Sequence, residues 1–420
     1  MGATALRARS LSFAEARATV LAAVTPLPPE TILLAAARGR ALRRAVLAAH
    51  DLPPFANSSM DGFAVRSADL AGASSAAPRR LPVVAVIPAG RVAPRPLAAG
   101  EAMRIMTGAA IPEGADAVVP FEDVERSDPA AAGEHVLIPR PVRAGESLRA
   151  AGADLRAGAV ALAEGRELSV HDLALLASLG EARTQVGPRP RAAVFSTGDE
   201  LLDVDEPLRP GAIRDSNLLM LTQMLEECGA VVVKAERLRD DAARVGASVR
   251  EALAEADVVL TIGGVSAGDF DPVKESLAAL GAIELWRVAM KPGRPQAFGA
   301  PGGRLFFGLP GNPASVACVF EALVRPALRK LQGHSALDRP RIPVRTAEAI
   351  ESRVGRTDFI RATIERRGDA WWASACGEQI SGHLTPQSRA HVLAVVPEEL
   401  ARVEPGTALE ALVLRWPDGD

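Results

Sequence analysis

The sequence predicts a multidomain protein of the α/β plus β class. Its centre is a doubly wound, mainly parallel α/β domain, accompanied by a β-rich inserted domain, a helical and extended linking domain and a C-terminal β-barrel-like domain. The length of 420 residues exceeds the range over which one hydrophobic core keeps growing. From Arg191 onward, short apolar runs alternate with helical patterns, which is typical of a parallel sheet covered by helices. On either side of this α/β region, short runs of strand-forming residues are interrupted by Pro and Gly.

The first part of the chain predicts a linking domain that a β-rich domain interrupts. Apolar residues recur at helical spacing over 11–24 and again over 169–179, where Ser169 is a suitable N-cap. Between these helices, short apolar runs such as 81–87 and 117–119 are broken by Pro or Gly. We therefore assign residues 1–50 and 155–187 to a discontinuous linking domain and residues 51–154 to the β-rich insert.

The middle of the chain predicts the α/β domain, which we assign to residues 188–334. Beyond it, Pro-punctuated strands such as 342–346 and 408–414 predict a C-terminal β-barrel domain over residues 335–420. The α/β domain is expected to contain strands at 192–196, 230–235, 257–262, 283–288 and 305–307, and helices at 218–227, 242–255, 274–280 and 314–331.

Composition argues against several functional classes. A net charge of −3 and an aromatic content of 4% do not suit a nucleic-acid-binding surface. The cysteines Cys228, Cys318 and Cys376 are odd in number and far apart, which favours reduced thiols over disulfides or a zinc site. Glu15 and Arg17 interrupt any signal-peptide core, and no apolar run reaches the roughly 20 residues of a membrane helix. We therefore expect a cytoplasmic protein with no nucleic-acid or membrane partner.

Three glycine-rich turns follow strands of the expected α/β domain, at the sheet edge where doubly wound folds bind ligands. They occupy residues 196–201, 261–268 and 308–313. Glycine lets backbone N–H groups approach an anion closely, and the next helix N-terminus adds partial positive charge. One such turn is common in any α/β domain, but three in one sheet favour a phosphate site. The candidate binding residues in these turns are Gly198, Gly263, Gly264, Ser266, Pro310, Gly311 and Asn312.

The phosphate must be held without the usual nucleotide motifs. Neither a P-loop nor a dinucleotide fingerprint is present, so nucleoside triphosphate hydrolysis and NAD binding lose their main sequence support. Glu200, Asp240 and Asp271 lie in or just after segments at the same sheet edge. A single loop carboxylate is more often a cap or turn residue. Mg²⁺ on a phosphate needs only one or two protein carboxylates, so the three together imply Mg²⁺.

Residues 291–294 read Lys-Pro-Gly-Arg, so that a rigid link holds two cations apart. A fixed oxyanion site requires such framing, and Lys291, Pro292 and Arg294 are candidate binding residues for this reason. A tight turn with exposed charges is the alternative interpretation of the same string. The six histidines show no metal-ligand spacing, and no Ser, His and Asp set indicates a hydrolase.

Six segments stand in order along the chain, at residues 59–65, 104–109, 196–201, 263–271, 291–295 and 308–315. Together they resemble the molybdopterin molybdenumtransferase family, which includes bacterial molybdenum-insertion enzymes and the E-domain of gephyrin. The resemblance extends from about residue 11 to about residue 414 and implies an elongated homodimer of four-domain subunits. It also implies that Asp61 and Thr107 of one subunit reach the ligand held by Glu200, Asp240 and Asp271 of the other.

The family's reaction takes adenylylated molybdopterin and molybdate, cleaves the phosphoanhydride, and releases AMP and molybdenum cofactor. Mg²⁺ would screen the phosphate charge and orient the attacking oxygen. By the same resemblance, molybdate would lie among Arg294, Ser315, Arg361 and Ser381, because guanidinium and hydroxyl donors suit a tetrahedral dianion. The adenylyltransferase of the preceding step is a candidate partner.

The chain departs from the family's pattern at three places. Arg294 stands where the family often has Lys, and Ile380 where it often has Gly. Residues 148–154 lack several charges of an Arg-rich stretch but keep Arg149 and Asp154, which remain candidate substrate contacts. Two other functions fit parts of the chain. An adenylyltransferase would be built of the α/β domain alone, which the additional domains oppose, and a dimeric scaffold would not need the retained carboxylates.

Overall fold

The computed structural model describes residues 9–126, 134–264 and 283–417, and these residues form two compact units. One unit comprises Met1–Arg44, Glu164–Val170 and Arg183–Asp420, and the other comprises Ala45–Ala163 and His171–Ala182. The first contains the α/β sheet and the C-terminal strands, and the second contains the β-rich segment. The finer division into four domains stays a prediction. The helix expected at 274–280 lies outside the described residues.

The α/β sheet of the first unit is mainly parallel. Four neighbouring strands, in the order β17-β14-β18-β21, all run in the same direction. Only β20, which the sequence did not predict, runs antiparallel between β21 and β19. The bounds are β14 (Arg191–Thr197), β17 (Val231–Leu238), β18 (Val258–Ile262), β19 (Ile283–Lys291), β20 (Pro295–Gly299) and β21 (Leu305–Leu309), with β1 (Arg9–Ser12) parallel to β19.

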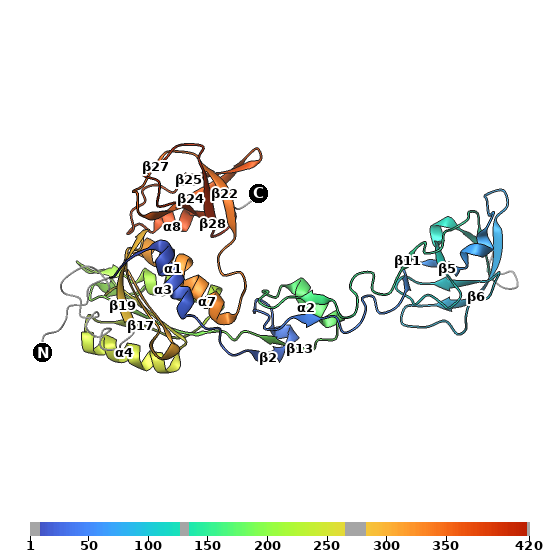
Figure 1. Cartoon of the computed structure of the whole chain (residues 1–420), viewed down its shortest axis with the longest axis horizontal. Coiled ribbons are helices and arrows are strands. Elements are labelled where there is room, and N and C mark those ends of the chain that lie inside the picture. Colours follow the sequence, from blue (N-terminus) through green and yellow to red (C-terminus); the bar gives the residue numbers. More distant parts are fainter. Residues whose placement is uncertain (1–8, 127–133, 265–282, 418–420) are drawn as a thin grey trace. The chain divides into compact units, whose positions relative to one another are not determined.

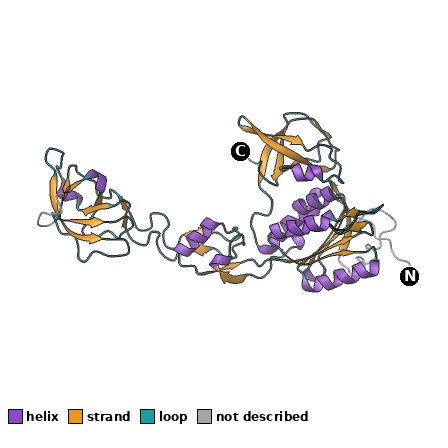
Figure 2. Ribbon diagram, turned by 180° about the vertical axis from the view of Figure 1, so that it is seen from behind, coloured by secondary structure: helices purple, strands orange, loops and turns teal. Residues whose placement is uncertain are grey.

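Helices cover both faces of this sheet (Figures 1 and 2). Alternate residues of β14 point to opposite faces: Ala192 and Val194 pack with α1, α3, α6 and α7, whereas Ala193 and Phe195 pack with α4. The helices are α1 (Phe13–Ala23), α3 (Ser216–Glu227), α4 (Ala242–Glu255), α6 (Pro313–Val319) and α7 (Arg325–Gln332), with a π-helical segment (Phe320–Val324) joining the last two. The expected helix at 11–24 was wrong at its start, because residues 11 and 12 end β1.

The start of α1 is set by local chemistry. The Ser12 hydroxyl accepts a hydrogen bond from the Glu15 N–H at 3.1 Å, and the Glu15 carboxylate accepts one from the Ser12 N–H at 2.8 Å. This reciprocal pair is a capping box, which satisfies two N–H groups that a helix start leaves without partners. The cap therefore stops the strand at Ser12 and begins the helix directly after it.

Five C-terminal strands close into a barrel. They pair in the order β24-β25-β22-β28-β26, and β26 pairs back to β24. Their inward residues, such as Ile360, Val392 and Ala411, form a core of their own. The barrel also joins the α/β sheet, because β24 pairs with the end of β19. Its elements are β22 (Arg341–Thr346), β23 (Ile350–Glu351), β24 (Thr357–Arg367), β25 (Ala370–Ala375), α8 (Thr385–Arg389), β26 (Val392–Val396), β27 (Arg402–Val403) and β28 (Ala408–Val413).

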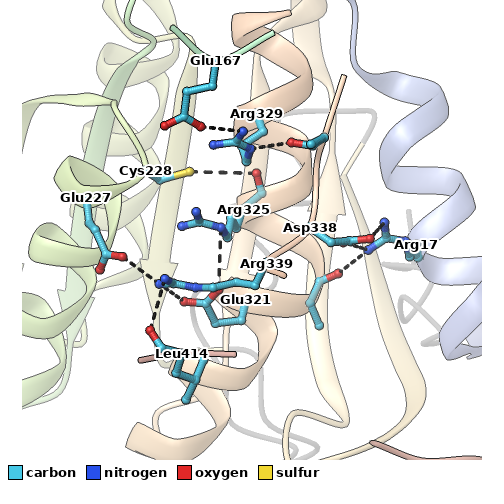
Figure 3. A network of polar contacts seen from close by, with 12 residues as sticks. Arg17, Glu167, Glu227, Cys228, Glu321, Arg325, Arg329, Asp338, Arg339 and Leu414 are labelled. Atoms are coloured by element: carbon cyan, nitrogen blue, oxygen red, sulfur yellow. Dashed lines mark hydrogen bonds and ion pairs between the residues drawn. The ribbon is translucent and has the colours of Figure 1, made fainter. Parts of the chain in front are cut away.

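A network of ion pairs, centred on the buried Glu321, fastens the segment that leads from α7 into the barrel (Figure 3). The Arg339 guanidinium makes two bonds of 2.9 Å to the Glu321 carboxylate and one of 2.9 Å to Glu227 on α3. Burial lowers the pKa of Arg339, but the hydrogen bond and charge of Glu321 and the charge of Glu227 outweigh burial and raise that pKa overall. Arg339 also donates to the Leu414 carbonyl at 3.4 Å, so the network reaches the last barrel strand.

The second unit is built on a six-stranded sheet in the order β8-β5-β7-β6-β10-β9. Phe63, Val65 and Val119 form a core on one side of the sheet, and Ala64, Met103 and Ile105 form one on the other. The strands of this sheet are β5 (Gly62–Val65), β6 (Arg79–Ile87), β7 (Ala102–Ile105), β8 (Ala117–Pro120), β9 (Glu125–Arg126) and β10 (His135–Ile138). Two further strand pairs are β3 (Val46–Leu47) with β12 (Val160–Leu162), and β4 (Asn57–Ser58) with β11 (Leu148–Arg149). The helix is α2 (Val170–Ser178).

One further strand pair belongs to the first unit, where β2 (Glu30–Leu33) runs antiparallel to β13 (Arg183–Val186). Arg40 ties this pair down, because its side chain donates to the Gly187 carbonyl and pairs with Glu30. Throughout the described residues, every helix is too short or too polar to pass through a lipid bilayer.

Candidate functional site

The three glycine-rich turns meet at the carboxyl edge of the α/β sheet, as the sequence predicted. They follow β14, β18 and β21, which are neighbours in the sheet. The Gly263 N–H donates to the Leu309 carbonyl at 2.9 Å, and the Thr197 hydroxyl donates to the Ile262 carbonyl at 3.3 Å. These bonds cross from one turn to the next, so the described parts of the turns adjoin one another.

Two glycines in these turns lie directly against neighbouring side chains. Gly263 has a φ of +88°, and a Cβ there would lie 2.9 Å from the Thr197 hydroxyl oxygen. At Gly198, with a φ of +153°, a Cβ would lie 2.6 Å from a carboxylate oxygen of Glu200. Glycine at 198 therefore lets the Glu200 carboxylate fold close over the backbone of the turn.

A cavity of about 330 Å³, here called the turn cavity, opens at this surface. Thr197, Glu200 and Gly311 line it, together with the first residues of α3 and with Leu384 from the barrel side. Its lining holds two carboxylates, of Glu200 and Asp215, and one cation, Arg214, beside the start of α3, where the N–H groups of a helix N-terminus favour a phosphate. The sequence predicted Glu200 and Gly311 as part of one site, and both lie on the turn cavity.

The α3 start contributes two residues that sequence reasoning missed. Asp215 is buried and accepts hydrogen bonds from the Ser196 hydroxyl and, at 3.0 Å, from the Leu218 N–H, so it caps α3. Asn217 donates to the Gly311 carbonyl at 2.7 Å and lines the turn cavity. The signal was present as Asp-Ser-Asn directly before a helical pattern, which is typical of an N-cap.

The candidate magnesium ligands are partly described. Thr197 pairs with Leu238 in the register of β14 and β17, so Glu200 and Asp240 follow adjacent strand ends. Asp271 lies outside the described residues, as does Ser266. Within the described ranges, no group of three His, Cys, Asp or Glu side chains could hold a metal by itself. Two hard carboxylates beside glycine-rich turns nevertheless fit Mg²⁺, which takes its other ligands from water and from phosphate.

A second cavity of about 680 Å³, here called the cation cavity, lies between the α/β sheet and the barrel. Four of its lining residues are cations and none is an acid. The geometry therefore selects for an anionic ligand. The four cations are Lys291, Arg294, Arg353 and Arg356.

Only one of these cations is neutralised by a neighbour. Arg356 makes two bonds, of 2.6 and 2.9 Å, to the buried Asp358 carboxylate. Lys291, Arg294 and Arg353 have no acidic partner within the described parts of the chain. Their charges are available to a bound anion.

The Lys-Pro-Gly-Arg string is a tight turn between β19 and β20. The Val288 N–H donates to the Arg294 carbonyl at 2.9 Å, and the Gln296 side chain donates to the Gly293 carbonyl at 2.7 Å. Gly293 has a φ of +109°, and a Cβ there would lie 2.5 Å from the Val319 side chain on α6. Close packing against α6 thus holds the turn in place, and Lys291, Pro292 and Arg294 all line the cation cavity.

Asn312 joins the two cavities, because it lines both. Its amide donates to the Ser381 hydroxyl at 3.0 Å, and the Ala314 N–H donates to the Ser381 carbonyl at 3.1 Å. Ser381 and the buried Ser315 also line the cation cavity, as does Pro310. The structure therefore brings Arg294, Ser315 and Ser381 to one cavity beside the turn cavity.

Arg361 lies behind the wall of the cation cavity rather than in it. Its side chain is 1% exposed and is not among the lining residues. It donates to the Gln379 side-chain oxygen at 3.2 Å, to the His383 carbonyl at 3.2 Å and to the Ile380 carbonyl at 3.1 Å. Burial lowers the pKa of this guanidinium. Its assignment to molybdate stays a prediction.

In the second unit, Asp61 and Thr107 form a pair. One Asp61 carboxylate oxygen accepts from the Thr107 N–H at 2.6 Å and from its hydroxyl at 2.7 Å. The hydrogen bond from the Thr107 N–H, followed by that from its hydroxyl, lowers the pKa of Asp61, so the carboxylate is charged and oriented. Arg149, on β11, and Asp154 are both exposed. The binding roles of these four residues stay predictions.

Family models match the chain in three consecutive regions. The MoeA N-terminal region (domain I and II) matches residues 11–180, a probable molybdopterin binding domain matches residues 193–330, and the MoeA C-terminal region (domain IV) matches residues 343–414. The three matches cover both compact units.

Individual relatives match over nearly their full length. The chain is 37% identical over 388 residues to molybdopterin molybdenumtransferase 2 of Mycobacterium tuberculosis, which covers 91% of this chain and 94% of that protein. It is 36% identical over 394 residues to the molybdopterin molybdenumtransferase of a Nostoc species, covering 92% and 89% of the two chains. The crystal structure of a molybdopterin biosynthesis MoeA protein from Pyrococcus horikoshii OT3 superposes with a TM-score of 0.82 at 27% identity, covering 96% of this chain and 100% of that one. The chain therefore belongs to the molybdopterin molybdenumtransferase family, an enzyme family of molybdenum cofactor biosynthesis.

Proposed function

We propose that this protein inserts molybdate into adenylylated molybdopterin and releases AMP. The observation that carries the proposal is the pair of cavities that share Asn312. One lies at the glycine-rich turns and the start of α3, where a phosphate ligand would bind, and the other is lined by four cations and no acid, as an oxyanion requires. A reaction that joins an oxyanion to a phosphate-bearing molecule needs such sites side by side.

The residues of the turn cavity would hold the phosphates. Backbone N–H groups of the glycine-rich turns that are not already bonded within the fold would donate to phosphate oxygens. Glu200 and Asp240, with Asp271, would hold a Mg²⁺ ion, which when bound would screen the phosphate charge. In the cation cavity, Lys291 and Arg294 would bind molybdate, with hydroxyl donors from Ser315 and Ser381.

The decisive assay follows AMP release from purified protein supplied with adenylylated molybdopterin, molybdate and Mg²⁺. We expect AMP release that depends on all three. Glu200→Gln should lose activity and still fold, because the change removes a hard negative charge with little change in volume. The matched control is Glu399→Gln, which removes an exposed carboxylate that lines neither cavity and should keep full activity. Formation of adenylylated molybdopterin from ATP and molybdopterin would instead support the adenylyltransferase alternative.

We also propose that the enzyme is a homodimer in which Asp61 and Thr107 complete the site of the partner subunit. Mixing inactive variants tests this directly. Asp61→Asn and Glu200→Gln chains, unfolded and refolded together, would form mixed dimers with one intact site. Equal mixing should then restore roughly a quarter of the wild-type activity. No recovery in a preparation that sedimentation shows to contain mixed dimers would rule out the shared site.

A further inference from the structure

We infer that Gln379 is a positioning and specificity-determining residue for the oxyanion. Its neutral side chain holds the Arg361 guanidinium behind the wall of the cation cavity without cancelling the guanidinium charge. The inference rests on the proposed function, because it concerns how the same cavity selects molybdate. Gln379 was not among the residues that the sequence analysis singled out.

Four hydrogen bonds fix the Gln379 side chain. Its Oε1 accepts from the Arg361 backbone N–H at 3.0 Å and from the Arg361 Nε at 3.2 Å. Its Nε2 donates to the Arg361 carbonyl at 3.2 Å and to the Gly377 carbonyl at 3.2 Å. The amide thus holds both the backbone and the side chain of Arg361. With all of its hydrogen-bonding positions in use, it has one favourable orientation.

The charge of Arg361 is buried and has no acidic counterpart. Its three side-chain partners are neutral oxygens, and in the described ranges no carboxylate pairs with it. The nearby Asp358, three residues earlier on β24, is already bound through both oxygens by Arg356. Buried charges are normally paired. A guanidinium held only by neutral groups therefore leaves a net positive charge in place.

This charge acts on the cation cavity through a thin wall. Gln379, Ile380 and Ser381 line the cavity, and Arg361 donates to the Ile380 carbonyl directly behind them. Ionic attraction reaches through such a wall, because little water lies between the charges to screen them. A glutamate at position 379 would have nearly the same shape as glutamine but would neutralise Arg361.

Calorimetric titration of the full chain with molybdate alone tests this. Gln379→Glu should weaken molybdate binding on the order of tenfold to a hundredfold, and Gln379→Ala by only a few fold because Arg361 keeps its charge. Glu378→Gln, a neighbouring change that removes a negative charge, is the matched control and should not weaken binding. If Gln379→Glu keeps the wild-type unfolding temperature and binds molybdate within about twofold of wild type, the inference is overturned.

A double-mutant cycle protects the test against a Gln379→Glu chain that fails to fold. If Gln379 acts through Arg361, then Gln379→Ala should weaken molybdate binding in the wild-type background but not in an Arg361→Met background. Equal weakening in both backgrounds would contradict the inference. In the turnover assay, the Gln379 variants should raise the molybdate concentration for half-maximal rate and leave the maximal rate within about twofold.

The two proposals fail in different ways. Absence of AMP release by the wild-type protein would count against the proposed function, whereas the molybdate titration needs no turnover. Unchanged molybdate binding by a folded Gln379→Glu chain would overturn the role of Gln379 and leave AMP release by the wild-type protein unaffected. A wild-type protein that does not bind molybdate would overturn the role of Gln379 outright.

Discussion

Two arginines of the first unit, Arg339 largely buried and Arg361 fully buried, are held in opposite ways. Arg339, which fastens the segment between α7 and the barrel, is bound by the carboxylates of Glu321 and Glu227 (Figure 3). Arg361, behind the cation cavity, is bound by one side-chain amide and two backbone carbonyls. Both side chains are removed from water, but only the first has its charge neutralised.

The difference separates charges that build the protein from charges that serve a ligand. A buried ion pair contributes little when intact but costs several kcal/mol when one partner is removed. A cation without an acidic partner contributes nothing comparable to stability, and its charge remains for a bound anion. The exposed cations Lys291, Arg294 and Arg353 belong to the second kind, because they line the cation cavity without acidic partners in the described residues.

The largest expected effect comes from Arg339→Met. The change leaves Glu321, which is 3% exposed, without its two bonds of 2.9 Å. We expect the free energy of unfolding to fall by about 3 kcal/mol, because Arg325, 3.9 Å from the same buried carboxylate, compensates its charge only in part. Urea unfolding followed by circular dichroism measures this. A loss below about 1 kcal/mol would mean that the network is not structural, and would remove the basis of the comparison.

Protonation of His334 at low pH would add a positive charge beside this network. His334 lies against the same cluster, and burial, with the charge of Arg329 next, lowers its pKa from 6.5 to about 4. The unfolded chain therefore takes up the proton first as the pH falls. The contribution of neutral His334 to the free energy of unfolding is therefore complete above about pH 6.5. It decreases as the pH falls from 6.5 to 4, by at most about 3 kcal/mol.

The variant His334→Gln isolates this contribution. Other titrating groups affect wild type and variant alike, so the difference between their free energies of unfolding reports His334 alone. We expect wild type to lose its advantage over the variant as the pH falls from 6.5 to 4. Parallel pH profiles for the two proteins would show that His334 is not held neutral by its surroundings.

The next effect concerns the ligand. Arg361→Ala should raise the molybdate concentration for half-maximal AMP release tenfold to a hundredfold, and high molybdate should restore the rate. The size follows from the loss of one positive charge that attracts the anion, which is worth about as much as a charge-assisted hydrogen bond, about 1.5 to 3 kcal/mol. Arg294→Ala should weaken molybdate binding similarly. Its free energy of unfolding should stay within about 0.5 kcal/mol of wild type, because Arg294 pairs with no acid in the described residues. An unchanged molybdate curve for Arg361→Ala would show that its charge serves the fold alone.

The smallest effect is expected from Arg341→Met, the counterpart of the first prediction. Arg341 pairs with Glu410 at 2.9 Å, but both side chains are largely exposed, at 45% and 67%. Exposed pairs contribute at most about 1 kcal/mol, so the free energy of unfolding should change by less than that. A loss as large as that of Arg339→Met would mean that burial does not decide which pairs matter.

Much of the first unit could be predicted from local patterns. The expected helix at 242–255 coincides with α4 (Ala242–Glu255), and the expected strand at 257–262 with β18 (Val258–Ile262). Helix periodicity and short apolar runs are local signals, because they depend only on residues that are close in sequence. The glycine-rich turns could also be predicted, because a backbone with a positive φ, as at Gly198 and Gly263, favours glycine at that position in the sequence.

Other features follow from pairings between distant residues and could not be predicted. Strand β20 begins with Pro295 and is only five residues long, and it is a strand because β19 and β21 lie on either side of it. The sequence singled out Arg361 as a molybdate ligand through its family resemblance, but nothing local indicated that the side chain would be buried. Its surroundings come from residues 376–384, which fold back onto β24 through long-range contacts.

The sequence by itself therefore determined the alternation of strands and helices, the turns at the sheet edge and the supply of cations and carboxylates near them. Tertiary structure decided which arginines withdrawn from water are neutralised. Arg339 meets the carboxylates of Glu321 and Glu227, which come from other parts of the chain, whereas Arg361 meets a glutamine and two carbonyls. The reason is physical: backbone conformation depends on neighbours in sequence, whereas the net charge of a buried site depends on which side chains the fold brings into contact with it.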